Sequence, residues 1–353
     1  MVNPKCKLVE QGFKKGSCDV YYQEKEMSSP EYLKDRACQV TLKEKEATPS
    51  RTIRSALLSR PEDYLSIYQS GCNFSCLKCH SWEFSQYRRG HWMSPGDILK
   101  LALEYADLVT VKEPRERATS SHAQDLCRHC GRCVLTGERS SRCPQKLEPE
   151  QVLFSPQGYG PARNILAFTG GDLTCSPEWY CQSSAKIKEA GLDLWILIET
   201  NGYGLTPDNL GLYKEAGVDS FWLDIKAWDK ETHKKLTGAE NHHILKLPEE
   251  IIKRDFTLEV LTLFIPGWVE TEEIKKIARL LAGVNKDTYF TILAFFGEYK
   301  LKDVSSPSLE QMVEAYQVSR EAGLKNVRLG NPGVFIKSQE DYENLLKYAK
   351  DAL

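Results

Sequence analysis

The chain has 353 residues, and 41% of them are hydrophobic, which is enough for one large domain or two ordinary ones with a real core. Its 47 Lys and Arg residues nearly balance 49 Asp and Glu residues, and the net charge of -2 argues against a general nucleic-acid binder. Because no long apolar run and no signal-peptide core occur, we expect a cytoplasmic protein without a membrane span. Its 12 cysteines are then expected to be thiols or metal ligands rather than disulfides.

Residues 1–63 form a charged, weakly periodic stretch. We expect an N-terminal extension that packs on the main domain and contains one or two short helices. Cys6, Cys18 and Cys38 are spaced too widely for a local metal site, so buried free thiols are the favoured interpretation.

From residue 64 onward, short β-type runs alternate with amphipathic helical runs, the pattern of parallel βαβ units. The predicted strands are residues 65–69, 164–169, 194–200, 221–226, 257–265, 288–295 and 326–329. The predicted helices are residues 95–108, 177–190, 206–216, 271–282, 308–322 and 339–352. This pattern predicts an α/β fold over residues 64–335, a partial (β/α)6 TIM-like barrel or else an open, curved parallel sheet, followed by a C-terminal helix in residues 336–353.

Three cysteines follow the first predicted strand. Cys72, Cys76 and Cys79 have C-x3-C-x2-C spacing, which can hold three irons of a four-iron cluster and leave the fourth iron open to a ligand. A zinc knuckle, a disulfide and ordinary buried cysteines are the alternatives. For zinc, His80 lies too near Cys79 in sequence to complete the site easily.

Polar or glycine-rich residues also follow the next three strands. In a parallel sheet the carboxyl ends of the strands gather at one edge, so we expect these residues to share a site with the cysteines. Paired glycines allow close approach to a ligand, and a carboxylate is the natural partner of an ammonium group. The residues concerned are Thr169, Gly170, Gly171, Asp172, Glu199, Thr200, Asn201, Gly202, Asp224 and Lys226.

A polar segment of about 50 residues, 110–160, interrupts the pattern and is expected to be an insert with its own metal centre. It carries four cysteines as C-x2-C-x2-C-x9-C-P, namely Cys127, Cys130, Cys133 and Cys143. The spacing is tighter than the paired knuckles usual for zinc and favours a second [4Fe-4S] cluster, with a zinc site as the alternative. Its expected role is electron relay or substrate contact.

These motifs together resemble the radical S-adenosylmethionine (SAM) enzymes. Within that superfamily the chain is similar to pyruvate formate-lyase activating enzyme and to AmmeMemoRadiSam-type proteins. The resemblance extends over residues 64–335 and rests on the three strand-end motifs in order, with segments such as CNFSCLKCHSWEFSQ, FWLDIKAWDKETHKKLTG and TLFIPGWVETEEI.

The resemblance implies roles for the strand-end residues. SAM would chelate the open iron, and Gly170, Gly171 and Asp172 would receive its methionine amino group, with Asp172 in place of the commoner Glu. Asp224 and Lys226 would line the SAM pocket as the catalytic pair. Thr200 and Asn201 would approach the ribose and carboxylate, and Glu199 belongs to the same cofactor-binding segment. One electron would then cleave SAM to methionine and a 5′-deoxyadenosyl radical.

The function expected from this resemblance is hydrogen abstraction from a peptide or protein, as in activation of a glycyl radical enzyme or another protein modification. The partners would be that protein and a reductant such as flavodoxin or ferredoxin. One alternative is a radical SAM methyltransferase or an enzyme that modifies a small metabolite, although no cobalamin-binding D-x-H-x-x-G signature supports a cobalamin cofactor. Another is a non-catalytic iron–sulfur electron carrier.

Overall fold

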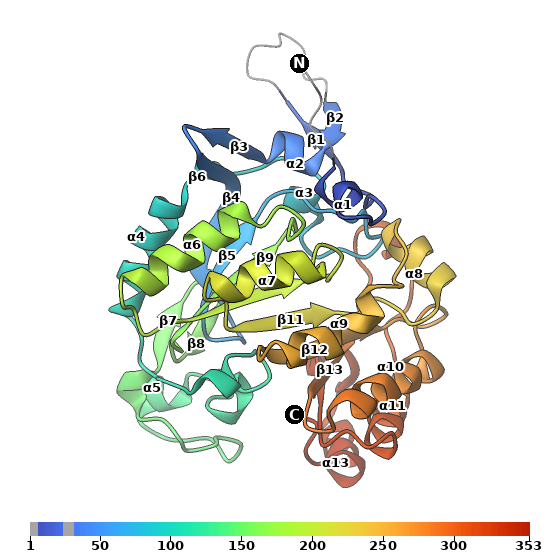
Figure 1. The fold of residues 1–353 in the computed structure, drawn as a ribbon. Helices are drawn as coiled ribbons and strands as arrows, with labels where there is room; N and C mark the ends of the chain where they lie inside the picture. Colours follow the sequence, from blue (N-terminus) through green and yellow to red (C-terminus); the bar gives the residue numbers. More distant parts are fainter. Residues whose placement is uncertain (1–5, 24–31) are drawn as a thin grey trace.

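The computed structural model describes residues 6–23 and 32–353, and its centre is a curved sheet whose parallel strands follow one another in chain order (Figure 1). Each predicted strand is present within two residues of its expected bounds, and the α/β partial-barrel prediction is confirmed. The parallel strands are β5 (Leu65–Gln69), β9 (Ile165–Gly170), β10 (Trp195–Thr200), β11 (Ser220–Asp224), β12 (Thr257–Phe264), β13 (Tyr289–Ala294) and β14 (Asn326–Gly330).

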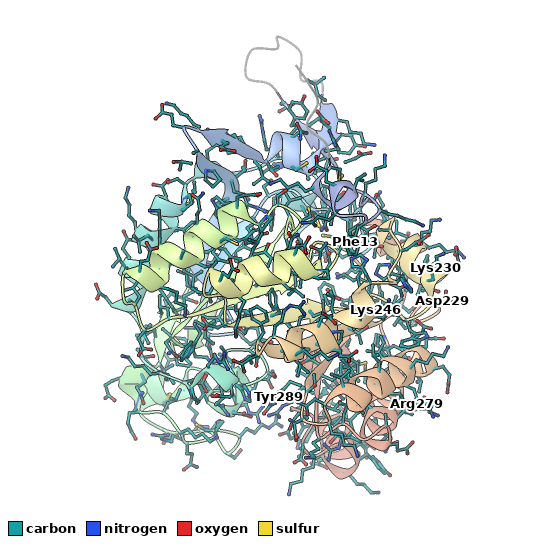
Figure 2. All side chains as sticks on the ribbon, in the orientation of Figure 1. Phe13, Asp229, Lys230, Lys246, Arg279 and Tyr289 are labelled. Atoms are coloured by element: carbon teal, nitrogen blue, oxygen red, sulfur yellow. The ribbon has the colours of Figure 1, made fainter. Side chains whose placement is uncertain are left out.

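Helices follow the strands as the βα pattern requires, and several begin at side-chain caps. Ser94 and Ser308 form capping boxes with the third helical residue of α4 and α11. Asp229 caps α8, and its Oδ1 accepts the Thr232 amide at 2.8 Å (Figure 2). The helices are α4 (Pro95–Ala106), α6 (Glu178–Glu189), α7 (Pro207–Glu215), α8 (Lys230–Thr237), α9 (Leu247–Lys253), α10 (Thr271–Val284), α11 (Leu309–Glu321), α12 (Pro332–Phe335) and α13 (Gln339–Tyr348).

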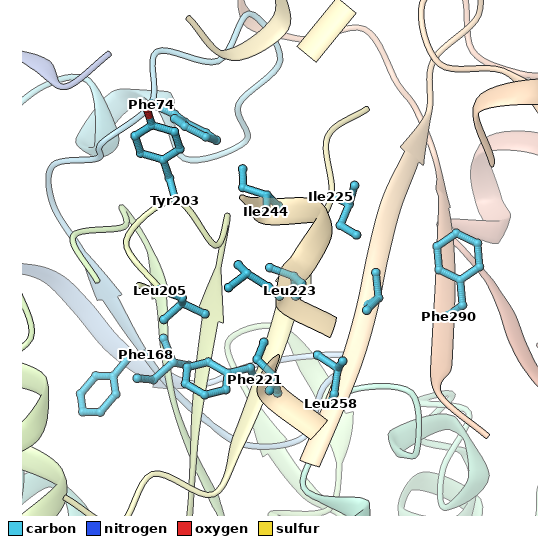
Figure 3. Close-up of a cluster of buried hydrophobic side chains, with 14 of the residues drawn as sticks. Phe74, Phe168, Tyr203, Leu205, Phe221, Leu223, Ile225, Ile244, Leu258 and Phe290 are labelled. Atoms are coloured by element: carbon cyan, nitrogen blue, oxygen red, sulfur yellow. The ribbon is translucent and has the colours of Figure 1, made fainter. Parts of the chain in front are cut away.

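The main core lies between the sheet and these helices. Alternate residues of each strand point outward into it, so Phe168, Phe221 and Phe290 are fully buried (Figure 3). The other face of the strands lines the barrel interior, where Tyr64 and Leu197 form a second, smaller core with Ala118 of the insert.

The N-terminal region differs from the expected short helices. It does contain α1 (Lys7–Glu10) and α2 (Ala37–Val40), but more of its described residues lie in strands, namely β1 (Asp19–Tyr22), β2 (Leu33–Arg36), β3 (Leu42–Lys45) and β4 (Thr48–Leu58). Strand β4 pairs antiparallel with β5 and with β6 (His91–Met93), so this edge of the sheet is not parallel and the sheet crosses the boundary proposed at residue 63. The domain boundaries themselves stay a prediction.

The insert lies at the amino ends of the parallel strands. It contains α5 (Arg132–Thr136) and a hairpin formed by β7 (Leu153–Ser155) and β8 (Gly158–Gly160). Outside the insert, the short helix α3 (Trp82–Ser85) follows the first cysteine loop. The hydroxyl of Thr257, the first residue of β12, donates to the Arg115 carbonyl at 3.1 Å. Among the described residues, no helix is long and apolar enough to cross a membrane.

Candidate active site

A cavity of about 430 Å³ opens at the carboxyl ends of β5, β9, β10 and β11, which we call the rim. The sequence-predicted residues gather here from four separate segments. The cavity is lined by Cys72, Cys76, Cys79, Thr169, Gly170, Asp172, Glu199, Thr200, Asn201, Asp224 and Lys226. The expected convergence of strand ends is therefore present in the structure, while the roles of these residues stay predictions.

The first cysteine loop, residues 72–79, is held in place by backbone hydrogen bonds to neighbouring loops. The Asn73 amide donates to the Asp172 carbonyl at 2.9 Å, and the Ser75 and Leu77 amides donate to carbonyls at the end of α8 at 3.0 and 2.8 Å. The Cys79 Sγ lies 3.2 Å from the Ser85 hydroxyl. The α8 helix, absent from the sequence prediction, thus supports the loop.

All three thiols of this loop have raised pKa values, and burial is the main cause. Burial and the nearby Asp172 raise the pKa of Cys72 to about 12, and burial raises the pKa of Cys76 well above its usual value. A buried thiolate is stable only beside positive charge, and a bound metal centre would supply it. Three convergent thiols beside an open cavity, two of them buried and that of Cys79 half-buried, therefore fit a cluster that keeps one open iron.

Two glycines bring the β9 end against the first cysteine loop. A Cβ atom on Gly171 would lie 2.3 Å from the Gly71 carbonyl oxygen, and Gly170 has φ +88°. The carbonyls of Gly71 and Gly171 both accept from Arg51 Nη2, at 3.3 and 2.9 Å. Arg51 of β4 is fully buried and clamps the two loops together. Sequence reasoning missed it because its strand was taken for an extension outside the barrel.

The Asp172 carboxylate is occupied by the chain itself. Its Oδ1 accepts the amide and the hydroxyl of Thr174, each at 2.8 Å. Its Oδ2 accepts the Thr200 hydroxyl at 2.7 Å and the Asn201 amide at 2.8 Å. Asp172 therefore joins the β9 and β10 ends, which is a positioning role that the sequence alone did not indicate.

The amide of Asn201 lies beside the first cysteine of the loop. Its Nδ2 donates to the Asn73 Oδ1 at 2.6 Å and lies 3.7 Å from the Cys72 Sγ. An N–H group directed at a ligand sulfur is one of the levers that set the potential of an iron–sulfur cluster.

Asp224 and Lys226 form an ion pair at the β11 end. Burial opposes the charge of Lys226, but Asp224 and the Cys76 thiol raise its pKa above the usual value. The Asp224 Oδ1 is buried without a hydrogen-bond partner in the described chain, and the residue lines the cavity. A ligand with a donor group would satisfy this oxygen.

Glu199 lines the cavity and also contacts Tyr64 in the barrel interior. Its carboxyl accepts hydrogen bonds from the Tyr64 hydroxyl at 3.0 Å and from the Thr169 hydroxyl. Burial raises the pKa of Glu199 to about 8. The carboxyl is therefore mostly protonated at neutral pH, in contrast to the Asp224 carboxylate, which is paired with a cation.

At the mouth of the cavity, the loop after β13 contacts the first cysteine loop. Lys78 forms an ion pair with Glu298, and its Nζ lies 3.7 Å from the Phe296 ring centroid. Trp82 stacks on Tyr299 with ring centroids 5.0 Å apart. These contacts join the loop after β13 to the segment that carries the cysteines.

The four cysteines of the insert lie away from this cavity, at the amino ends of the strands. The His129 amide donates to the Cys127 Sγ at 3.3 Å, and the Gln145 amide donates to the Cys143 Sγ at 3.4 Å. The His129 ring bonds to Asp63, which precedes β5. Among the described residues, no three His, Cys, Asp or Glu side chains are arranged around a single metal ion. The second metal centre stays a prediction.

Comparison with known proteins agrees with the composition of the rim. Residues 124–281 match the family described as Radical SAM superfamily. A Methanocaldococcus jannaschii protein assigned as a glycyl-radical enzyme activating enzyme is 28% identical over 158 residues, which are 44% of this chain and 58% of the relative. The isethionate sulfite-lyase activating enzyme of Oleidesulfovibrio alaskensis is 25% identical over 70% of this chain and 88% of its own length.

A solved domain of pyruvate-formate lyase-activating enzyme from Bacteroides vulgatus has 19% identity and a TM-score of 0.41, and it covers 47% of this chain and 98% of its own length. This likeness is too weak to add to the argument. The match to the Radical SAM superfamily is limited to residues 124–281, which contribute the ends of β9, β10 and β11 to the cavity, and the C-x3-C-x2-C loop lies outside the matched residues.

Proposed function

We propose that this chain binds a [4Fe-4S] cluster on Cys72, Cys76 and Cys79, cleaves SAM reductively and abstracts hydrogen from a peptide or protein. The observation that carries the proposal is the cavity at the rim, where the buried thiols of Cys72 and Cys76 and the half-buried thiol of Cys79 meet the ends of β9, β10 and β11. When bound, the cluster and SAM supply one-electron cleavage and a 5′-deoxyadenosyl radical.

The residues around the cavity provide binding and positioning. Gly170 and Gly171 let the β9 end pack closely against Phe84 and the Gly71 carbonyl, and Gly170 lines the cavity. Lys226 places a positive charge beside Cys76 and offsets the negative charge of thiolates and of a bound carboxylate. The Asp224 Oδ1, which lacks a partner in the described chain, is available to a ligand ammonium or hydroxyl group.

A protein substrate is supported by the names of the relatives. An activating enzyme of a glycyl-radical enzyme, as in Methanocaldococcus jannaschii, acts on another protein. The cavity lining includes the aromatic side chains of Phe74 and Phe296, which can help to exclude water from a reactive radical once a chain segment covers the cavity. A reductant such as flavodoxin or ferredoxin completes the proposed set of partners.

The reaction class is tested by anaerobic reconstitution of the full chain with iron and sulfide, followed by dithionite and SAM. We expect 5′-deoxyadenosine and methionine in equal amounts by mass spectrometry, and neither from the Cys76→Ser variant. If the wild-type chain carries its cluster yet yields no 5′-deoxyadenosine, the proposed function is wrong.

The substrate class is tested separately with isotopes. The proteins of the same cell are labelled with glycine deuterated at Cα, cleared of small molecules and added to the reaction. Deuterium in the 5′-deoxyadenosine would show abstraction from a protein glycine. Unlabelled 5′-deoxyadenosine in every such reaction would contradict glycyl activation while leaving SAM cleavage intact.

A further inference from the structure

Four cysteines outside the two predicted metal centres come together beside the first cysteine loop. They are Cys6, Cys18, Cys38 and Cys175, and all four are free thiols. Cys6 lies just before α1, and Cys18 lies just before β1. Cys38 is in helix α2, and Cys175 is in the loop after β9. In Figure 1, α1, α2, β1 and β2 lie together at one end of the molecule, next to α3.

Strand pairing brings Cys18 and Cys38 together. Strands β1 and β2 are antiparallel, with Asp19 opposite Arg36. One position further, the Ala37 amide donates to the Cys18 carbonyl at 2.7 Å. Cys38 is the next residue, so the two cysteines lie on adjacent segments.

Helix α1 brings Cys6 to the loop that carries Cys175. Lys7 forms an ion pair with Glu178, the first residue of α6, three positions after Cys175. The side chains of Cys6 and Cys18 pack against the same core that buries Cys175.

Hydrogen bonds fix the same docking further along the segment. Gln11 Nε2 donates to Asn209 Oδ1 at 3.0 Å, and Asn209 Nδ2 donates to the Thr174 carbonyl at 3.4 Å. Phe13 packs edge-on against His243, with ring centroids 5.2 Å apart (Figure 2). The N-terminal segment is therefore held against the loop of Thr174 and Cys175 rather than lying loosely on the surface.

The mutual influence of the thiols agrees with this geometry. Burial raises the pKa of Cys175 well above its usual value, and the charges of Asp172, Cys38, Cys6 and Cys18 add to the increase. Burial, together with Cys38 and Cys6, raises the pKa of Cys18 to about 11. These contributions agree with the backbone hydrogen bond and the ion pair that bring the four cysteine-bearing segments into one region.

This region adjoins the first cysteine loop directly. The Ser17 Oγ lies 2.6 Å from the Ser75 Oγ. A Cβ atom on Gly16 would lie 2.3 Å from the Asn73 carbonyl oxygen, so the two backbones touch. The four thiols thus lie behind the loop that lines the active-site cavity.

We propose that Cys6, Cys18, Cys38 and Cys175 bind an additional iron–sulfur cluster. Four cysteines close a four-iron cluster completely, and thiolates without imidazole or carboxylate partners are soft ligands that suit iron–sulfur and zinc centres. Structural zinc sites usually take their cysteines in closely spaced pairs, and no two of these four are so spaced. This site is independent of the SAM chemistry and of the four cysteines in the insert.

The test uses the full chain, reconstituted without oxygen, and measures iron, sulfide and zinc per molecule. The Cys18→Ser/Cys38→Ser double variant is compared with Cys181→Ser, a half-buried cysteine of α6 outside all three groups. We expect the double variant to lose about four irons and four sulfides per chain, and Cys181→Ser to lose none. Equal iron in the double variant, or zinc that disappears with these two thiols, would overturn the proposal.

A second variant distinguishes loss of the cluster from misfolding of the N-terminal region. Cys6→Ser changes a half-buried residue that precedes α1 and leaves β1, β2 and α2 untouched. Like the double variant, it should contain less iron than the wild type, while its circular dichroism spectrum stays that of the wild type. A folded Cys6→Ser variant with full iron would count against ligation by this residue and against a four-cysteine cluster. The Cys76→Ser variant should keep the iron of this region, so failure of the SAM site is distinguishable.

Discussion

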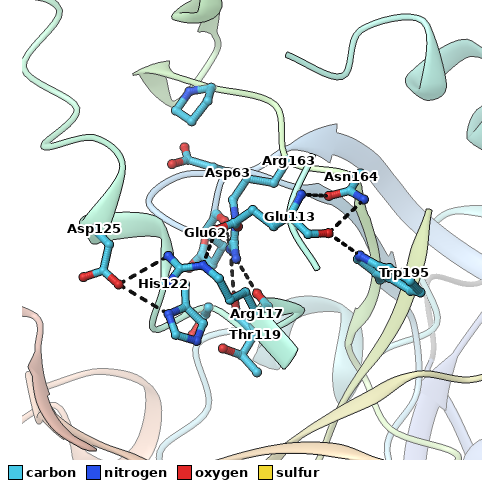
Figure 4. Close-up of polar contacts among 12 residues, drawn as sticks. Glu62, Asp63, Glu113, Arg117, Thr119, His122, Asp125, Arg163, Asn164 and Trp195 are labelled. Carbon is cyan, nitrogen blue, oxygen red and sulfur yellow. Dashed lines mark hydrogen bonds and ion pairs between the residues drawn. The ribbon is translucent and has the colours of Figure 1, made fainter. Parts of the chain in front are cut away.

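The two ends of the barrel are built from similar residues for opposite purposes. At the rim, the paired charges of Asp224 and Lys226 face a cavity of about 430 Å³, and the Asp224 Oδ1 has no partner in the described chain. At the amino end, which we call the floor, Arg163 is fully buried beside Glu113. Figure 4 shows this arginine surrounded by groups of the chain itself.

The Arg163 guanidinium donates to the carbonyls of Glu62, Thr119 and Arg117 at 3.1, 2.7 and 2.6 Å, and its Nε bonds to Glu113. Glu259, also buried, accepts the Ser120 and Ser121 amides at 2.9 and 3.1 Å. Buried charges that the chain satisfies completely belong to structure, whereas a buried charge with an unused atom beside a cavity indicates a ligand. The insert thus closes the floor, and the rim stays open for chemistry.

The largest effect is expected at the floor. Arg163→Met would remove one of the two guanidinium partners of the buried Glu113 carboxylate, leaving only Arg117, and would take a donor away from three backbone carbonyls. Breaking a buried ion pair from one side costs about 3–5 kcal/mol, so the free energy of unfolding should fall by that amount. Urea denaturation under anaerobic conditions measures it.

The matched control removes an exposed pair on the same insert. Lys112 and Asp193 are 69% and 57% exposed, and Lys112→Met should change the free energy of unfolding by less than about 1 kcal/mol. If Arg163→Met were equally mild, the floor would not be the structural closure inferred here.

A smaller effect is expected at the rim from Gly171→Ala. The added Cβ would overlap the Gly71 carbonyl oxygen and push the first cysteine loop away from the β9 end. We expect a loss of about 1–3 kcal/mol in the free energy of unfolding and weaker retention of iron during gel filtration.

Gly211 provides the control for the same chemical change. It lies in α7, where an added Cβ would meet no atom within 4 Å, so Gly211→Ala should be neutral or stabilise the fold by up to about 1 kcal/mol. Equal iron retention in both variants would show that the rim does not depend on this close approach.

The strands of the barrel could be predicted because buried parallel strands are continuous apolar runs, as in residues 165–168. The rim followed from topology, since parallel strands deliver their carboxyl ends to one edge. Strand β4 was missed because its burial does not alternate along the strand and because its three consecutive buried residues include the fully buried, charged Arg51. Helix α8 was missed because its sequence KETHKKLT is mostly polar and too short for a periodic pattern.

Contacts between distant segments were beyond the reach of the sequence. The Glu113–Arg163 pair joins residues 50 positions apart. Cys6 and Cys175 are even farther apart in the sequence. Spacing rules detect ligands on one loop, so they identified Cys72, Cys76 and Cys79 as a group. They gave no sign of the gathering of Cys6, Cys18, Cys38 and Cys175, which depends on how β1, β2 and α1 dock.

Glu199 contacts both the rim cavity and the barrel interior, and its pKa tells whether its carboxyl is ionised or neutral in the folded protein. Burial raises its pKa to about 8, whereas a glutamate in the unfolded chain titrates near its usual value of about 4.3. Below that lower pKa the carboxyl is protonated in both the folded and the unfolded state, so its contribution to the stability of the folded state is fully present. As the pH rises toward 8 the unfolded state alone loses its proton, so the folded state loses stability.

Glu199→Gln keeps an acceptor for the Tyr64 hydroxyl but cannot ionise. Between pH 5.5 and 7.5 its free energy of unfolding should therefore fall less steeply than that of the wild type, by up to about 1.4 kcal/mol per pH unit. Urea denaturation at three pH values measures the slope, and Glu272→Gln, an exposed position on α10, should leave it unchanged. An unaltered slope in Glu199→Gln would mean that this carboxyl is ionised in the folded protein, as a rim residue facing a cation would be. A flattened slope would mean that it is held neutral by Tyr64 and Thr169, as part of the packed interior beneath the cavity.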